Sequence, residues 1–144
     1  MGLYEFESNK NTLNNDHVYF KKFLGDEYIY QNMNMNNCGF ITDEVMELIE
    51  DIFMDANSDY NRYEPTKYNR KQIDFIINSL SERLNDIENG IDLKVSKNNW
   101  FSDDWRKILV NIYNNNEEEL KKFFVKLIEW LKNINVDNII LIGI

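Results

Sequence analysis

Apolar residues recur along this chain at two spacings, one typical of helices and one typical of a buried strand. Between Asn116 and Ile134 they return every three or four positions, which places them on one face of an amphipathic helix. The segment from Ile139 to Ile142 is apolar without polar alternation, as in a strand buried on both faces. The sequence therefore predicts that this closing helix and strand form the centre of the core.

The same helical spacing predicts three earlier helices. The first begins near Thr42, a preferred N-cap residue. The second is opened by Asn69 together with Gln72 and closed by Gly90, which is the residue expected just beyond a helix end. The third begins at Ser102. With the closing helix, these give about four helices.

Short alternating or aromatic segments predict strands at residues 3–7, 17–24, 27–33 and 91–95. Residues 17–24 and 27–33 flank Gly25 and Asp26, which favours a hairpin. The single proline, Pro65, lies in what we interpret as a polar connection between the first two helices. We expect one α+β domain spanning residues 1–144, with about four helices packed on a small mixed sheet and a buried C-terminal strand; the strand order stays open.

The net charge of -9 is concentrated in the first part of the chain. Residues 1–61 carry twelve Asp and Glu against three Lys, whereas residues 62–144 carry thirteen charges of each sign. Such an excess of acids would repel nucleic acid, whose binding proteins neutralise phosphates with Lys and Arg. A basic protein partner is expected instead.

The features that direct a protein to a membrane or to an oxidising compartment are not evident in the sequence. Cys38 is the only cysteine, so no disulfide forms within the chain. The first residues carry acids where a signal peptide would carry bases, and the longest apolar run is far shorter than the roughly 20 residues that span a bilayer. We expect a cytoplasmic protein with no membrane partner.

Few residues are suited to catalysis or to cofactor binding. His17 is the only histidine and Cys38 the only thiol, too few to form a nucleophile with its base or a typical zinc site. The five glycines are scattered rather than gathered in a phosphate-binding loop. We therefore expect a non-enzymatic protein without a cofactor.

One stretch invites a metal hypothesis. Asp and Asn alternate from Asp55 to Asn61, as do the first ligands of a calcium loop. Tyr60 stands where that loop needs glycine, however, and Thr66 stands where it needs a bidentate Glu. Alternating Asp and Asn residues are also ordinary turn formers. We therefore predict no metal site.

The first helix carries many acids and no compensating base. No Lys or Arg occurs between Lys22 and Arg62, so these acids have no basic partner one helical turn away. They could simply keep the protein soluble, but acids beside Met and Tyr also suit a basic partner with apolar anchors. The predicted partner-binding residues are Asp43, Glu47, Glu50, Asp51, Met54, Asp55, Asp59, Tyr60 and Tyr63.

In general character the whole chain resembles bacterial immunity proteins that protect against contact-dependent or polymorphic toxins: it is small, acidic on one side and poor in catalytic residues. The closing segment, Glu117 to Ile144, is also similar in pattern to the end of the ribonuclease inhibitor barstar. The resemblance implies a non-enzymatic inhibitor that binds one cognate toxin, often a basic nuclease. It identifies no individual binding residue.

Two other hypotheses remain open. The chain could be a small-ligand-binding domain or an enzyme that uses carboxylates and tyrosines, in which case a small molecule would raise its melting temperature. It could also mimic the charge of nucleic acid, in which case it would compete with DNA for a basic protein. The sequence leaves the oligomeric state open.

Overall fold

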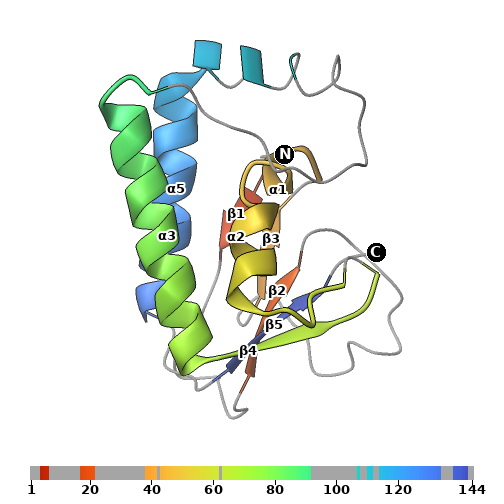
Figure 1. Ribbon diagram of the computed structural model, residues 1–144. Coiled ribbons are helices and arrows are strands. Elements are labelled where there is room, and N and C mark those ends of the chain that lie inside the picture. Colours follow the sequence, from red (N-terminus) through yellow and green to blue (C-terminus); the bar gives the residue numbers. More distant parts are fainter. Residues whose placement is uncertain are drawn as a thin grey trace.

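A computed structural model describes residues 4–6, 17–21, 38–41, 43–61, 63–91, 107, 110–111, 114–133 and 138–142. Five strands within this part form one sheet in the order β1-β3-β2-β5-β4 (Figure 1). The strands are β1 (Tyr4–Phe6), β2 (His17–Lys21), β3 (Cys38–Ile41), β4 (Thr66–Asn69) and β5 (Asn138–Ile142). The three middle strands run parallel, and each edge strand is antiparallel to its neighbour.

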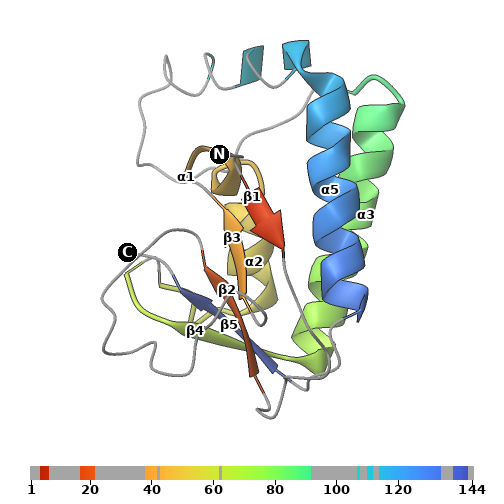
Figure 2. The same cartoon turned by 180° about the vertical axis from the view of Figure 1, so that it is seen from behind.

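The helical segments are α1 (Asp43–Met46), α2 (Glu50–Ala56), α3 (Arg70–Glu88) and α5 (Glu117–Asn133). The long helices α3 and α5 lie side by side in both ribbon views, and α2 lies over one face of the sheet (Figures 1 and 2). Within the described ranges, no helix has the length and apolar character required to cross a bilayer.

One apolar cluster joins the helices to the sheet. Both long helices contribute the faces that their sequence periodicity predicts, and β5 lies between β2 and β4 with most of its side chains buried. Among the described residues, the largest side chains that are essentially inaccessible to solvent are those of Tyr68, Phe53, Phe124, Ile41, Met46, Leu48, Ile49, Ile73, Ile76 and Leu80.

The predicted ends of α3 are confirmed by its hydrogen bonds. The Asn69 side chain accepts a bond from the Gln72 backbone N–H, and the Gln72 side chain accepts one from the Asn69 N–H, both at 2.9 Å. At the other end Gly90 has φ +76°, and the Ile91 N–H donates to the Asp86 carbonyl. Glycine adopts this left-handed conformation without steric cost, so the helix ends where the sequence indicates.

The α+β class is confirmed, but the four helices expected from the sequence are not all matched by the described helical segments. The helix expected from Thr42 to Asp55 is divided into α1 and α2 by a turn at residues 47–49. The helix expected at Ser102 lies almost entirely outside the described residues. The buried C-terminal strand is present as β5.

The strands differ more from the prediction. The structure forms β4 in the segment that we interpreted as a polar connection, with Thr66 and Tyr68 buried and Lys67 and Asn69 exposed. β2 has β3 on one side and β5 on the other, both parallel, and the hairpin was expected to pair residues 17–24 with residues 27–33. Those residues, and residues 92–95 of another predicted strand, lie outside the described part.

Candidate functional site

Two of the acids predicted to bind a partner are not on the surface. The side chains of Glu47 and Glu50 are 0% exposed and lie within a continuously buried segment from Val45 to Glu50. A helix with regular periodicity would have placed both on its outer face. They therefore cannot contact a partner in this structure, and the prediction that they form a docking face is wrong.

Glu47 and Glu50 are turned inward by the break between α1 and α2. The N–H groups of Leu48, Ile49 and Ile52 each donate to the carbonyl three residues earlier, at 3.0 to 3.1 Å, instead of four residues earlier. This tighter winding changes the direction in which successive side chains point. The Leu48 carbonyl is also not used by Ile52, as it would be in a continuous helix, and so it can accept another donor.

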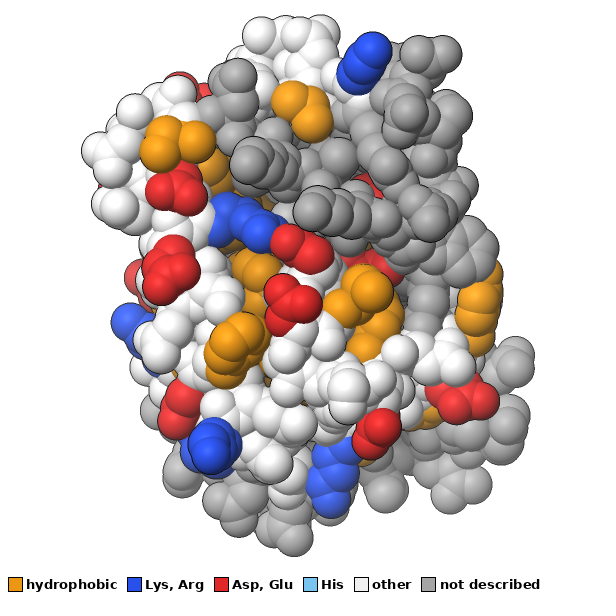
Figure 3. All heavy atoms as spheres, viewed as in Figure 1, with side chains coloured by type: hydrophobic (Ala, Val, Ile, Leu, Met, Phe, Trp, Pro, Cys, Tyr) orange, Lys and Arg blue, Asp and Glu red, His pale blue; other side chains and the backbone are white. Residues whose placement is uncertain are grey.

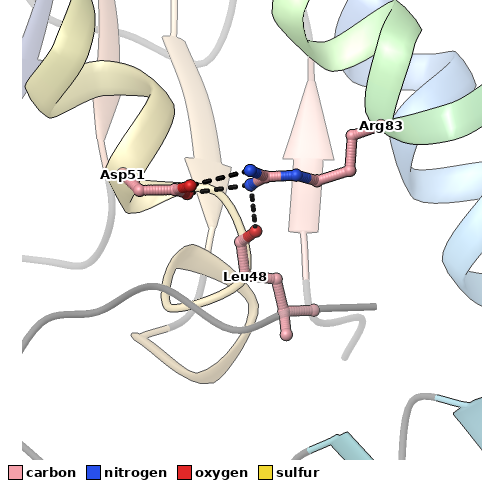
Figure 4. Close-up of polar contacts among 3 residues, drawn as sticks. All are labelled: Leu48, Asp51 and Arg83. Atoms are coloured by element: carbon pink, nitrogen blue, oxygen red, sulfur yellow. Dashed lines mark hydrogen bonds and ion pairs between the residues drawn. The ribbon is translucent and has the colours of Figure 1, made fainter. Parts of the chain in front are cut away.

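Arg83 of α3 supplies that donor. Its Nη1 donates to the Leu48 carbonyl at 2.9 Å and to Asp51 Oδ1 at 2.8 Å, and its Nη2 donates to Asp51 Oδ2 at 2.7 Å (Figure 4). Planar guanidinium groups suit such paired contacts with a carboxylate. Asp51, another predicted partner-binding residue, therefore has a structural role in joining α2 to α3. No feature of the local sequence pairs these residues, although Arg83 stands at the edge of the apolar stripe of α3.

Replacing Arg83 with methionine is expected to lower the free energy of unfolding by about 1 to 2 kcal/mol, because the variant loses charged hydrogen bonds at a half-buried position. The matched control is Arg70→Met on the same helix. Arg70 pairs with Asp74 at 3.6 Å in an exposed position, so this change should cost less than about 0.5 kcal/mol. Urea denaturation measures both values, and equal losses would contradict the structural role of Arg83.

A buried tyrosine lies beneath α2. The Tyr68 hydroxyl donates to the Phe53 carbonyl at 2.9 Å, and the two rings meet edge to face with centroids 5.6 Å apart. Burial raises the pKa of Tyr68 far above its ordinary value, and the neighbouring Tyr60 and Glu50 raise it further. This hydroxyl is therefore kept neutral and fixes β4 to α2.

The remaining predicted residues divide by exposure. Met54 is 43% exposed and Tyr63 is 56% exposed, and Asp55 and Asp59 are also exposed. Tyr60 is half-buried against the core. Asp43 is the first residue of α1, but its side chain lies outside the described part. The structure thus leaves four of the predicted residues available on the surface at the end of α2 and in the loop that follows.

That loop is fixed by its own asparagines. Asn57 Oδ1 accepts the Asp59 N–H, and Asn61 Oδ1 accepts the Tyr63 N–H, each at 2.9 Å. The Asn57 side-chain amide also donates to the Lys67 carbonyl of β4 at 2.9 Å. The alternation of Asp and Asn thus forms turns, which was the alternative to a calcium loop. Because these side chains hold the backbone, Asp59 and Tyr63 are presented on an ordered loop.

Comparison of the chain with protein-family models, with curated proteins and with solved structures finds no match.

Proposed function

We propose that this protein is a cytoplasmic, non-enzymatic immunity protein that binds and neutralises a cognate bacterial toxin. The docking surface that we propose consists of Met54, Asp55, Asp59 and Tyr63. It is smaller than the surface inferred from the sequence, because Glu47 and Glu50 are buried and Asp51 is held by Arg83.

One observation carries the proposal: an exposed Met and an exposed Tyr accompany two exposed acids on a short helix and an ordered loop. Aromatic and Met side chains are enriched where proteins bind one another. A surface that is already ordered loses less conformational entropy on binding. This arrangement favours recognition of a protein over catalysis.

The charge indicates what kind of partner fits. Asp55 and Asp59 form no ion pair within the described ranges, so they are available to an oppositely charged surface. The net charge of -9 would speed association with a basic toxin, such as a nuclease domain, by electrostatic steering. The same charge opposes binding to nucleic acid.

The test uses the product of the gene next to this one as the candidate toxin, together with a triple variant, Asp55→Lys, Asp59→Lys and Tyr63→Ser. We expect association to slow at least about tenfold at low salt, while stability changes little because all three side chains are exposed. The control, Glu88→Lys with Glu129→Lys, makes the same change in net charge at exposed positions elsewhere. Stopped-flow binding and protection of toxin-expressing cells are the measurements.

If the triple variant and the control bind the toxin equally well, this surface is not the docking surface. If the neighbouring product is not toxic and does not bind, the immunity function itself is contradicted. A saturable rise in melting temperature with a small molecule would instead support the ligand-binding alternative.

A further inference from the structure

The contact of Arg83 with α2 identifies which edge of α3 borders α2. Successive helical residues are rotated by about 100°. On one side of Arg83 this rotation places the buried stripe that includes Ile76 and Leu80. On the other side, about 60 to 100° from Arg83, it places Asp86, Phe75 and Glu82. Around the axis of α3, these three residues therefore lie on the side that borders α2, farther from the core than Arg83.

All three are exposed. Phe75 is 44% exposed, an unusual fraction for a large aromatic side chain, and Glu82 and Asp86 are also on the surface. Neither acid forms an ion pair with the described residues. The exposed Lys71 lies one turn before Phe75, so the acidic part is the C-terminal half of the helix.

Both α2 and α3 lie on the side of the molecule that Figure 3 presents. Acidic and hydrophobic side chains are scattered over this side, with Lys and Arg side chains among them. The exposed residues of α2 are Met54 and Asp55. The two helices together thus display acids around two exposed apolar side chains.

We propose that this edge of α3, comprising Phe75, Glu82 and Asp86, is a second half of the docking surface, and that its occupant is a basic protein segment. Lysine or arginine side chains of that segment would pair with Glu82 and Asp86, and an apolar side chain would pack between Phe75 and Met54. This inference rests on the proposed function, and it adds residues that neither the acidic first part of the chain nor the loop contains.

Charge complementarity is the reason for choosing this occupant. Asp55, Glu82 and Asp86 are three acids with no basic partner in the described part, and burying them against a neutral or acidic surface would be costly. Phe75 can stack on a guanidinium or pack on an aliphatic stem, both of which a basic protein segment supplies.

The experiment uses the full chain and a synthetic helix-forming peptide that carries lysines around a pair of leucines. Titration of the isotope-labelled protein with this peptide should shift the amide resonances of residues 75–86 of α3 together with those of α2. The variant Glu82→Lys with Asp86→Lys should weaken peptide binding at least about tenfold, and Phe75→Ser at least about threefold. The variant Glu88→Lys with Glu129→Lys is the control of equal charge.

Equal weakening by the two double variants would overturn the proposal, because it would show attraction to net charge without a defined surface. Resonance shifts confined to other elements would also overturn it. The same variants are then tested with the candidate toxin. Loss of toxin binding in the triple variant Asp55→Lys, Asp59→Lys and Tyr63→Ser, but not in Glu82→Lys with Asp86→Lys, would refute the role of α3 and leave the proposed function standing. Absence of toxin binding by the parent chain would refute the function alone.

Discussion

A lysine in place of Glu50 is expected to lower the free energy of unfolding by more than about 3 kcal/mol, which would leave much of the protein unfolded. The Glu50 side chain is 0% exposed and lies among apolar core residues near Tyr68. A lysine ammonium in this position would be removed from water beside groups that accommodate a carboxylate. The same result is expected for Glu47→Lys. A surface position would tolerate either change.

Two controls separate burial from charge. Asp55→Lys makes the same reversal on an exposed position of the same helix, and it should change stability by no more than about 0.5 kcal/mol. Glu50→Gln keeps the shape of the side chain and should lower the free energy of unfolding less than Glu50→Lys does. Circular dichroism during urea denaturation gives the values. A folded Glu50→Lys protein with near-normal stability would show that this carboxylate reaches the surface.

The second large effect is expected at Tyr68. Tyr68→Ala should lower the free energy of unfolding by about 3 to 5 kcal/mol, because it leaves a cavity between β4 and α2 and removes the edge-to-face contact with Phe53. Tyr68→Phe removes only the hydroxyl that donates to the Phe53 carbonyl, which still accepts the Asn57 N–H. The free energy of unfolding of Tyr68→Phe should be about 1 kcal/mol lower than that of the parent. Equal losses in the two variants would contradict this account.

Tyr68 should also make the protein sensitive to alkali. Because its pKa in the folded state is raised, the native hydroxyl stays protonated while the unfolded chain ionises above about pH 10. This stabilising contribution is fully present below that pH and is lost as the pH rises, at up to about 1.4 kcal/mol per pH unit. Urea midpoints measured at rising pH should fall more steeply for the parent than for Tyr68→Phe. Parallel curves would contradict the burial of this hydroxyl.

The parts of the fold that the sequence predicts correctly are those that local rules determine. The capping pair Asn69 and Gln72, the glycine at position 90 and the apolar stripes of α3 and α5 depend on residues within a turn or two of one another. At the break between α1 and α2, by contrast, the contact with Arg83 joins residues far apart, since Arg83 is 32 residues from Asp51 along the chain. No periodicity within 43–56 can reveal that contact.

The same limit explains the errors at the candidate site. Glu47 and Glu50 were assigned to the surface by extending one helical register through Ile49, whose backbone is not helical (φ -130°, ψ -4°). β4 was missed because four residues beside a proline give little periodic signal. Positions beyond the break, such as Asp55 and Tyr63, are exposed, as polar turns and short helix ends are in most folds.

The side chains that contact β4 have a consequence for how the protein meets other chains. Lys67 and Asn69 alternate with the residues whose side chains are buried, and their main-chain groups already bond to Asn57 and Gln72. An unpaired strand edge is a template on which another chain can add a strand and begin to aggregate. On β4, two of these main-chain groups already form hydrogen bonds with side chains of the same chain. Strand addition along β4 is therefore disfavoured, and β4 is a poor place for a second copy to extend the sheet.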